Sequence, residues 1–386
     1  MRELCIFPAV FRVSASYTVR MSVLSRIADI FPPPRFMTLP SVGVDISESS
    51  LKYMQFRTED RTRTVMHWGD IFLSPGIIAR GSITDVKGLA AALTQVHAIC
   101  GTPYIRVSLP EERAYLFETA IERGTAEEDI RNVLEFRMEE NVPLSPRDAF
   151  FDYDIVEDDR NDRILRIGVA VYAKETILNY HDACREAKLM PLSFEVEADA
   201  IGRAAVPAGG DGVYMILDVG KMRTGIGIIY KHALLYTSTI DIGGQQFSDA
   251  LSRQVGARED SVLTQLKNER GLLRTGGDDD VYEALLPTMS ALKDEVTTRI
   301  TYWNTRSIES GARTIEKIIL CGGSVNMAGL PEYLTEVLGI ETERVDVWRN
   351  VFARADIVPP IARRQSYGYA TAIGLALRDT LEQHSS

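Results

Sequence analysis

The sequence has few cysteines and no long apolar run. Its cysteines lie far apart with no CxxC spacing. Neither a zinc site nor a disulfide framework is therefore indicated, and a reducing compartment such as the cytoplasm fits best. No apolar run approaches the ~18–20 residues that span a bilayer, so we expect that the chain does not cross a membrane. The four cysteines are Cys5, Cys100, Cys184 and Cys321.

Basic residues are also too few to dominate the surface. The 386 residues include 43 Lys and Arg against 54 Asp and Glu, which gives a formal net charge of -11 and a pI near 5.1. This charge does not attract nucleic-acid phosphates or anionic lipid in general. No nucleic-acid partner is therefore expected, and any membrane association should be indirect. The hydrophobic content of 45% is that of a globular protein with two or three domains.

The first forty residues are interpreted as an extension outside the folded body. Leu4–Phe11 is apolar but short and contains Pro8, and small residues follow at Ser14–Ser16. These features resemble a secretory signal only weakly. We favour an early start codon, with Met21 as the alternative start, and we place the extension at residues 1–40.

A first α/β domain is predicted from residue 41, with a small insert inside it. Residues 41–103 show strand, turn and strand followed by helical spacing, and residues 174–207 continue the same domain. Between them, residues 104–173 follow the order strand, helix, strand, strand, with Ile105–Leu109 as the first strand. A unit of this size fits an inserted subdomain.

A breaker cluster at 207–212 marks the boundary with a second domain. Residues 212–378 repeat the strand-turn-strand pattern. They contain a helical subdomain at 258–308, whose second helix is expected to begin near residue 288. Residues 379–386 are expected to form a short polar tail.

Two turns carry the same chemistry near the start of each domain. The segments 42–52 and 216–225 each end an apolar strand with an aspartate, Asp45 or Asp218, and then turn. A carboxylate beside the backbone N–H groups of such a turn suits Mg²⁺ with a phosphate chain. Either turn alone is most simply an aspartate that caps a tight hairpin. Two such turns facing each other would clamp both sides of a triphosphate.

Two glycine pairs follow further strands. Gly243 and Gly244 precede an amphipathic helix, and Gly322 and Gly323 join a strand to another helix. Glycine after a strand lets the backbone approach a ligand closely, and a helix N-terminus favours anions. Either pair alone is weak evidence, because turn geometry can require glycine by itself.

In chain order, these four elements resemble the two phosphate loops, the GG helix start and the adenosine loop of the actin-like ATPase superfamily. The seven-residue separation of Asp45 from Lys52 matches the first loop of that superfamily. Within it, the sequence is most similar to the PilM family of cytoplasmic type IV pilus assembly proteins, with the division protein FtsA more distant. The likeness covers residues 41–378 and includes the stretches 107–111, 131–143, 195–198, 350–352 and 369–377.

The resemblance implies an α/β, actin-like ATPase fold with two ribonuclease H-like lobes and an SHS2-like βαββ insert in the first lobe. It also implies ATP and Mg²⁺ as ligands, with at most slow hydrolysis. Asp45 and Asp218 would hold Mg²⁺ directly or through water, and Glu197 would position an attacking water. The residues implied to bind the nucleotide are Ser47, Ser49, Ser50, Lys52, Gly220, Thr224, Gly243, Gly244, Glu295, Gly322, Gly323 and Ser324.

The second phosphate loop departs from the family pattern. Lys221-Met222-Arg223 stands where small residues and serines are usual. Two cations here would strengthen triphosphate binding through charge-assisted contacts, or else disturb the geometry of the metal and the nucleotide. Fast hydrolysis is therefore not expected.

The resemblance further implies a membrane-bound partner. This would be the short cytoplasmic tail of PilN, a single-pass inner-membrane protein, bound as an extended peptide in a groove between the insert and the first lobe. Arg131, Phe136 and Arg137 are the candidate groove residues. Other pilus platform or motor proteins are further candidate partners. The protein would then be cytoplasmic and peripheral to the inner membrane.

Three other interpretations remain open at this point. An FtsA-like division or shape protein would polymerise and bind lipid, and such chains usually end in an amphipathic helix, whereas residues 378–386 are short and polar. A phosphotransferase on the same fold would need a catalytic aspartate and a substrate pocket, and the sequence identifies neither. A degenerate pseudo-ATPase would never bind nucleotide, which Lys221 and Arg223 make conceivable.

Overall fold

The computed structural model describes residues 40–59, 62–157, 163–256, 259–274, 279–309, 313–352 and 357–381. The predicted extension at residues 1–40 and the end of the predicted tail lie outside the described residues. Two five-stranded sheets form the body, and a smaller three-stranded sheet lies beside them.

The first sheet combines an antiparallel meander with two parallel strands. Its strands are β1 (Val42–Ile46), β2 (Ser50–Glu59), β3 (Thr62–Phe72), β6 (Tyr104–Leu109) and β10 (Met190–Val196). The order is β10-β6-β1-β2-β3, with β6 parallel to both β1 and β10. Nearly every residue of β1 and β6 is buried, as expected for central strands covered on both faces. Helices α2 (Val86–Cys100) and α4 (Lys174–Glu186) share its core, and a short hairpin of β4 (Ile78–Ala79) and β5 (Ser82–Ile83) lies between β3 and α2 in the chain.

The second sheet repeats this topology. Its strands are β11 (Val213–Val219), β12 (Thr224–Tyr230), β13 (Ala233–Ile240), β14 (Lys317–Cys321) and β15 (Glu341–Arg344). The order β13-β12-β11-β14-β15 again places an antiparallel meander beside two parallel strands. The strand-turn-strand repeat of the sequence therefore corresponds to a repeated sheet. In each sheet the central strand is the one that ends at a predicted metal-binding aspartate.

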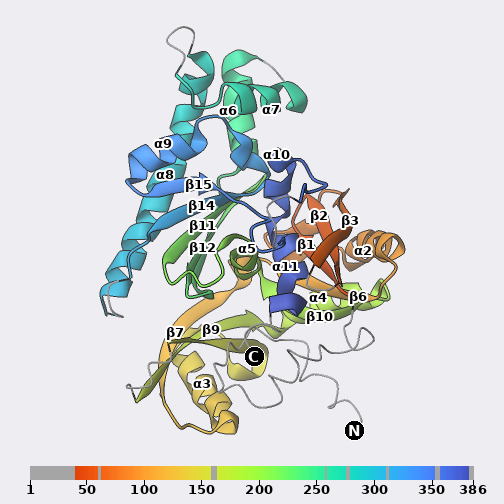
Figure 1. The fold of residues 1–386 in the computed structure, drawn as a ribbon, viewed down its shortest axis with the longest axis vertical. Coiled ribbons are helices and arrows are strands. Elements are labelled where there is room, and N and C mark those ends of the chain that lie inside the picture. The colour runs from red at the N-terminus through yellow and green to blue at the C-terminus, as the bar shows by residue number, and fades with distance from the viewer. Residues whose placement is uncertain are drawn as a thin grey trace.

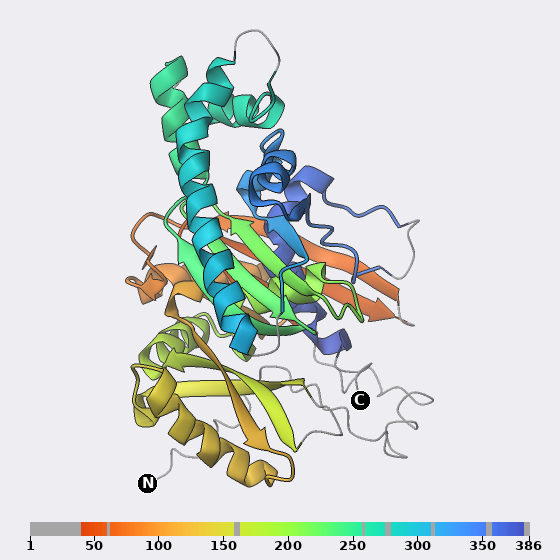
Figure 2. The same ribbon diagram turned by 90° about the vertical axis from the view of Figure 1, so that its left-hand side faces the viewer.

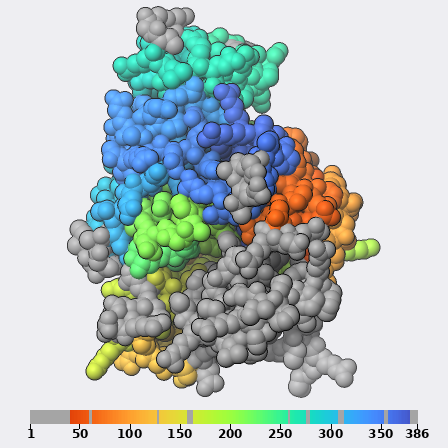
Figure 3. All heavy atoms as spheres, viewed as in Figure 1, coloured from red at the N-terminus to blue at the C-terminus, as the bar shows by residue number. Residues whose placement is uncertain are grey.

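Helices complete the second lobe and extend it at one end. They are α6 (Gly244–Val255), α7 (Asp260–Glu269), α8 (Asp280–Glu309), α9 (Leu330–Leu338) and α10 (Arg363–Ser366). Figure 2 shows α8 running lengthwise along the lobe. This helix begins at Asp280 and not near residue 288, because Val281 and Leu285 are buried in the core while Pro287 is accommodated inside the helix. Helices α6 and α7 lie at the end of the molecule opposite the insert (Figures 1 and 3).

Helix α11 (Ala370–Leu381) packs on the first lobe, although the sequence placed residues up to 378 in the second. It lies beside α5 (Glu197–Ala205) and over β1. Two glycines allow this close approach. A Cβ on Gly374 would lie 1.7 Å from the carbonyl oxygen of Ala200, and one on Gly43 would lie 2.2 Å from that of Ala372. Both α5 and α11 therefore fill the space between the two sheets.

A buried carboxylate holds α5, α11 and β10 together. Glu195 on β10 lies 2.7 Å from Nη1 of Arg203 on α5 and 2.8 Å from Nη1 of Arg378 on α11. Ser193 donates a further hydrogen bond of 2.8 Å to it. Burial alone would raise the pKa of Glu195, but the two arginine charges and these hydrogen bonds lower it to about 2.

The insert is a βαββ unit that begins later than predicted. It contains β7 (Tyr115–Glu122), α3 (Glu127–Asn141), β8 (Ala149–Glu157) and β9 (Ile164–Ala173), with sheet order β7-β9-β8. The boundary at residue 104 is wrong, because β6 belongs to the sheet of the first lobe. Strand β6 is buried along its length, and it is hydrogen-bonded along both edges to strands of the first lobe, β1 and β10. Strand β7, an edge strand, opens the insert instead.

The two faces of the insert's sheet have different neighbours. Phe117 and Val169 face α3 and form a separate core with Leu134. On the opposite face, Gly168 lies against Leu235 of β13, and a Cβ there would come within 3.4 Å of its side chain. The sheet therefore lies between α3 and the second lobe, and the outer side of α3 faces away from the body (Figure 2).

We predict that Glu195→Gln costs roughly 3–5 kcal/mol of unfolding free energy at neutral pH, because two buried guanidinium groups lose their carboxylate. The pKa of Glu195 is about 2 in the folded chain against an ordinary 4.5. Its contribution is therefore present above pH 4.5 and is lost as the pH falls toward 2. Urea unfolding should show the gap between variant and wild type shrinking from neutral pH to about pH 3.

The matched control is Glu341→Gln. Glu341 pairs with Lys317 at 2.9 Å, but its side chain is 66% exposed, so its loss should cost at most about 1 kcal/mol. Equal losses for the two variants would contradict the role given to Glu195.

Candidate functional site

A cavity of about 470 Å³ lies between the two lobes. The turn from β1 to β2 lines it from the first lobe, and the turn from β11 to β12 lines it from the second. Both predicted metal-binding aspartates reach it, as do most of the predicted nucleotide-binding residues. Those that line it are Asp45, Ser47, Ser49, Ser50, Lys52, Glu197, Asp218, Gly220, Gly244, Gly322, Gly323 and Ser324.

The first loop is shaped by its serines. The hydroxyl and the backbone N–H of Ser47 both donate to the carbonyl of Ser50, at 2.8 and 2.9 Å. Lys52 Nζ lies 3.2 Å from the Ser50 hydroxyl, so its charge points into the cavity. Burial raises the pKa of Asp45, while the charge of Lys52 and a hydrogen bond from Ser108 oppose the increase.

The second loop is held against the glycine pairs. The carbonyl of Gly220 accepts from the N–H of Gly244 at 2.9 Å and from the hydroxyl of Ser324 at 3.0 Å. A Cβ on Gly244 would lie 2.2 Å from that hydroxyl, so only glycine permits this contact. Burial and the nearby charge of Asp45 raise the pKa of Asp218 to about 6.

Two further carboxyls, Glu111 and Glu197, are buried in the same cavity. Burial raises the pKa of both well above the ordinary value, and the charges of Asp218 and Asp45 add to the effect. Glu111 follows β6 directly and is only 4% exposed, and its Oε2 has no hydrogen-bond partner among the described residues. The sequence showed Glu111 only as part of a family stretch and gave it no role.

The cavity is lined by twice as many acidic as basic side chains. Such a site favours a ligand that brings a cation. Within the described chain, no group of three or more His, Cys, Asp or Glu residues is arranged to hold a metal ion. Proteins usually bind Mg²⁺ through only one or two carboxylates, with phosphates and water as the other ligands. The acidic residues are Asp45, Glu48, Asp70, Glu111, Glu112, Glu197, Asp218 and Asp260, and the basic residues are Lys52, Lys221, Arg223 and Lys267.

Three predicted residues do not line the cavity. Thr224 is buried and donates to the carbonyl of Ile242 at 2.6 Å. Gly243 begins α6, and a Cβ there would lie 2.6 Å from the backbone nitrogen of Arg223. Both residues therefore support the second loop without facing the ligand. Glu295 pairs with Arg299 along α8 and lies outside the lining of the cavity, so its contact with ribose or adenine stays a prediction.

Helix α7 of the second lobe lines the cavity, whereas Glu295 on α8 does not. Thr264, Lys267 and Asn268 line the cavity, while Leu263 turns into the core. Lys267 Nζ donates to the hydroxyl of Ser248 at 2.7 Å and to the carbonyl of Gly244 at 3.2 Å. The sequence predicts a helical subdomain here, but the direction of α7 toward the cavity depends on how α6 and α7 pack.

Of the predicted partner-binding residues, only Phe136 is an unpaired apolar group at the surface. It is 63% exposed on α3. Arg137 pairs with Glu140 on the same helix, and the Arg131 guanidinium lies 4.8 Å from the centre of the Phe151 ring. Because the sheet separates α3 from the second lobe, these residues do not face the body. The groove expected between the insert and the first lobe stays a prediction.

The family model for the type IV pilus assembly protein PilM matches residues 43–380. A search of curated proteins found no match. Among solved structures, the chain is similar to a PilM-PilN type IV pilus biogenesis complex, with 20% identity and a TM-score of 0.72 over 90% of this chain and 99% of that one. It is also similar to MreB5 of Spiroplasma citri bound to ADP, with 11% identity and a TM-score of 0.53 over 90% and 98% of the two chains. These likenesses confirm the actin-like fold.

Along the described ranges, no helix combines the length and hydropathy that a bilayer crossing needs.

We predict that Asp218→Asn stabilises the nucleotide-free, metal-free protein above pH 6. The folded pKa of Asp218, about 6, exceeds its ordinary value of 3.8. Its protonated form therefore favours folding below pH 3.8, and this contribution is lost as the pH rises through 6. The amide should raise the unfolding free energy by roughly 1–3 kcal/mol at pH 8 and by much less at pH 4.

Denaturant unfolding at the two pH values measures this difference. Asp249→Asn, at an exposed aspartate of α6, is the control and should change stability by no more than about 0.5 kcal/mol. If Asp218→Asn lowers the unfolding free energy at pH 8, the inference that the charged Asp218 destabilises the folded chain is wrong.

Proposed function

Since the chain belongs to the PilM family of type IV pilus assembly proteins, we propose that it is an assembly scaffold that binds ATP with Mg²⁺ between its lobes. One observation carries the proposal: the aspartates that end the central strands of the two sheets line a single cavity. A ligand that touches both would hold the lobes in one relative position.

The residues around the cavity fit a magnesium nucleotide. Asp45 and Asp218 would hold the metal, which supplies positive charge between the phosphates and the carboxylates. Lys52 and the backbone of the serine turn would receive phosphates from the first lobe, with Gly220 and Gly244 opposite them. Gly323 has open space beside its α-carbon, which suits close approach of the nucleoside to Gly322–Ser324.

Slow hydrolysis is part of the proposal. Glu197 begins α5 and lines the cavity, so it can reach a water beside the phosphates. Burial and then the nearby acidic charges raise its pKa well above the ordinary value, which favours the protonated carboxyl. It would then orient water more readily than accept a proton from it.

The proposed partner is the cytoplasmic tail of a PilN-like inner-membrane protein. The similar structure named above contains PilM with PilN, and the insert presents an exposed phenylalanine, Phe136, on its outer helix. A tail bound there would place the protein at the inner membrane. Other pilus platform or motor proteins remain proposed partners.

We expect Mg-ATP to raise the thermal unfolding midpoint, because a ligand that binds only the native state stabilises it, by about 2.7 kcal/mol at 100-fold excess over Kd. Asp45→Ala and Asp218→Ala should each abolish the rise. Differential scanning fluorimetry measures it. Glu295→Ala is the control that should retain the full rise, because Glu295 does not line the cavity. A rise that survives in both aspartate variants would rule out this nucleotide site.

We expect Phe136→Ala to weaken binding of a synthetic PilN tail peptide by about tenfold or more, since truncating a buried aromatic anchor typically costs at least ~2 kcal/mol. Isothermal titration calorimetry measures the affinity. The control is Leu273→Ala, at a leucine that is 47% exposed on the second lobe, which should bind normally. If the two variants bind equally well, α3 is not the docking surface.

A further inference from the structure

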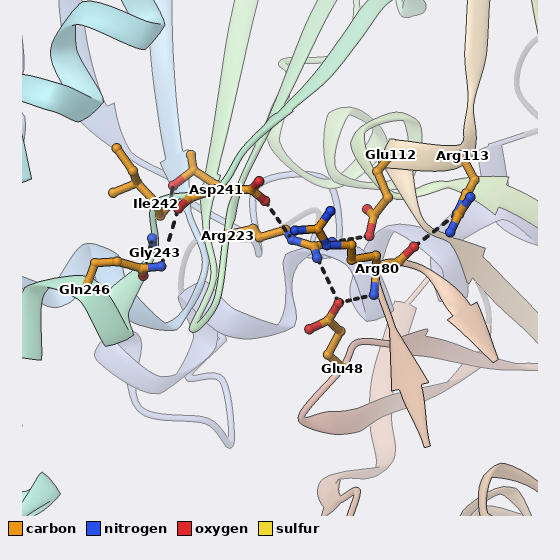
Figure 4. Close-up of polar contacts among 10 residues, drawn as sticks. Glu48, Arg80, Glu112, Arg113, Arg223, Asp241, Ile242, Gly243 and Gln246 are labelled. Atoms are coloured by element: carbon orange, nitrogen blue, oxygen red, sulfur yellow. Dashed lines mark hydrogen bonds and ion pairs between the residues drawn. The ribbon is translucent and has the colours of Figure 1, made fainter. Parts of the chain in front are cut away.

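Arg223 contacts three carboxylates, and two of them belong to the other lobe. It lies in the second loop, and its Nη2 is 3.1 Å from Oε1 of Glu48 in the first loop. Its Nη1 contacts Glu112 of the first lobe, and its Nε lies 3.1 Å from Asp241, which follows β13 in the second lobe. Figure 4 shows the guanidinium at the centre of these groups.

Contacts with the β4–β5 hairpin position the two first-lobe carboxylates, Glu48 and Glu112. Glu48 also accepts a hydrogen bond of 2.5 Å from the backbone N–H of Arg80, between β4 and β5. Arg113, next to Glu112, donates to the carbonyl of Arg80 at 3.0 Å and to Ser82. The β4–β5 hairpin therefore fixes both acceptors, and Arg223 reaches them from the other lobe.

The position of Arg223 favours a role beyond holding the lobes together. Arg223, Glu48 and Glu112 all line the cavity that contains Asp45 and Asp218. The Arg223 side chain is 18% exposed, whereas that of Asp241 is 77% exposed and does not line the cavity. A guanidinium forms its strongest hydrogen bonds with carboxylates and phosphates, often through two N–H groups at once. A phosphate that enters the cavity can therefore replace Glu48 and Glu112 as its acceptor.

We propose that Arg223 distinguishes a nucleoside triphosphate from a diphosphate by exchanging its contacts with Glu48 and Glu112 for the terminal phosphate. This rests on the proposed binding of ATP between the lobes. A diphosphate leaves the contacts with Glu48 and Glu112 intact. A triphosphate releases them, so the state of the nucleotide changes the bonds between the lobes.

The proposal predicts that substitution of Arg223 and substitution of its first-lobe carboxylates change the preference for triphosphate over diphosphate in opposite directions. Arg223→Gln should lower the preference for triphosphate over diphosphate by about tenfold or more, the loss expected for a charge-assisted hydrogen bond. Glu48→Gln and Glu112→Gln should raise that preference, because the carboxylates no longer compete for the guanidinium. Asp241→Asn removes a contact with Arg223 within one lobe and is the matched control, with an unchanged preference.

Isothermal titration of the full chain with Mg-AMPPNP and with Mg-ADP measures this ratio. Thermal unfolding without nucleotide checks that each variant is folded, and Arg223→Lys, which keeps the charge without the fork of N–H groups, should give an intermediate ratio. If Arg223→Gln and the two glutamate variants shift both affinities equally, the network only holds the lobes together and the proposal is wrong. If the wild-type chain binds neither nucleotide, the proposed function itself fails, and this inference fails with it.

Discussion

The partial burial of two carboxyls, Asp45 and Asp218, in one cavity is the constraint on which the site depends. Each ends the central strand of its sheet, and both line one cavity. Burial raises both pKa values, and Asp45 raises that of Asp218 further. Lys52 opposes the effect without cancelling it, and Glu111 and Glu197 line the same cavity as further acids. The cavity therefore favours the entry of protons or of a ligand that brings a cation.

The paired aspartates could be predicted because the pattern that produces them is local and occurs twice. An apolar strand, an aspartate and a small-residue turn are visible within about ten residues, and the family likeness placed the two copies in one cleft. The repeated sheet order explains why both copies face the same cavity. Long-range packing was less visible. Strand β6 is equally apolar whether it opens an insert or fills a sheet, and only its pairing with β1 and β10 decides between them.

Contacts between distant parts of the chain also determine which residues reach the cavity. Glu295, suggested by the family likeness, pairs with Arg299 on α8 and does not line the cavity, whereas α7 contributes Thr264, Lys267 and Asn268. Helix α11 packs on α5 because Gly374 has no side chain that would clash with the Ala200 carbonyl. This is a contact between distant parts of the chain. Arg223 was recognised as an unusual cation in the second loop, but its acceptor Glu112 is 111 positions away. Sequence patterns identify such groups without showing what they pair with.

The insert depends on both lobes, and this links the partner surface to the cleft. Its chain connections are to the first lobe, whereas its sheet packs on β13 of the second. Arg313 of the second lobe pairs with Glu118 of β7 at 2.9 Å, and its guanidinium lies 4.5 Å from the centre of the Tyr230 ring. Strand β13 ends one residue before Asp241, the second-lobe carboxylate of the Arg223 network. Any movement of one lobe against the other must therefore either carry the insert with β13 or break the Arg313–Glu118 pair. The strand that supports the insert leads directly into Asp241, so the insert is connected through β13 to the loop that contacts Arg223.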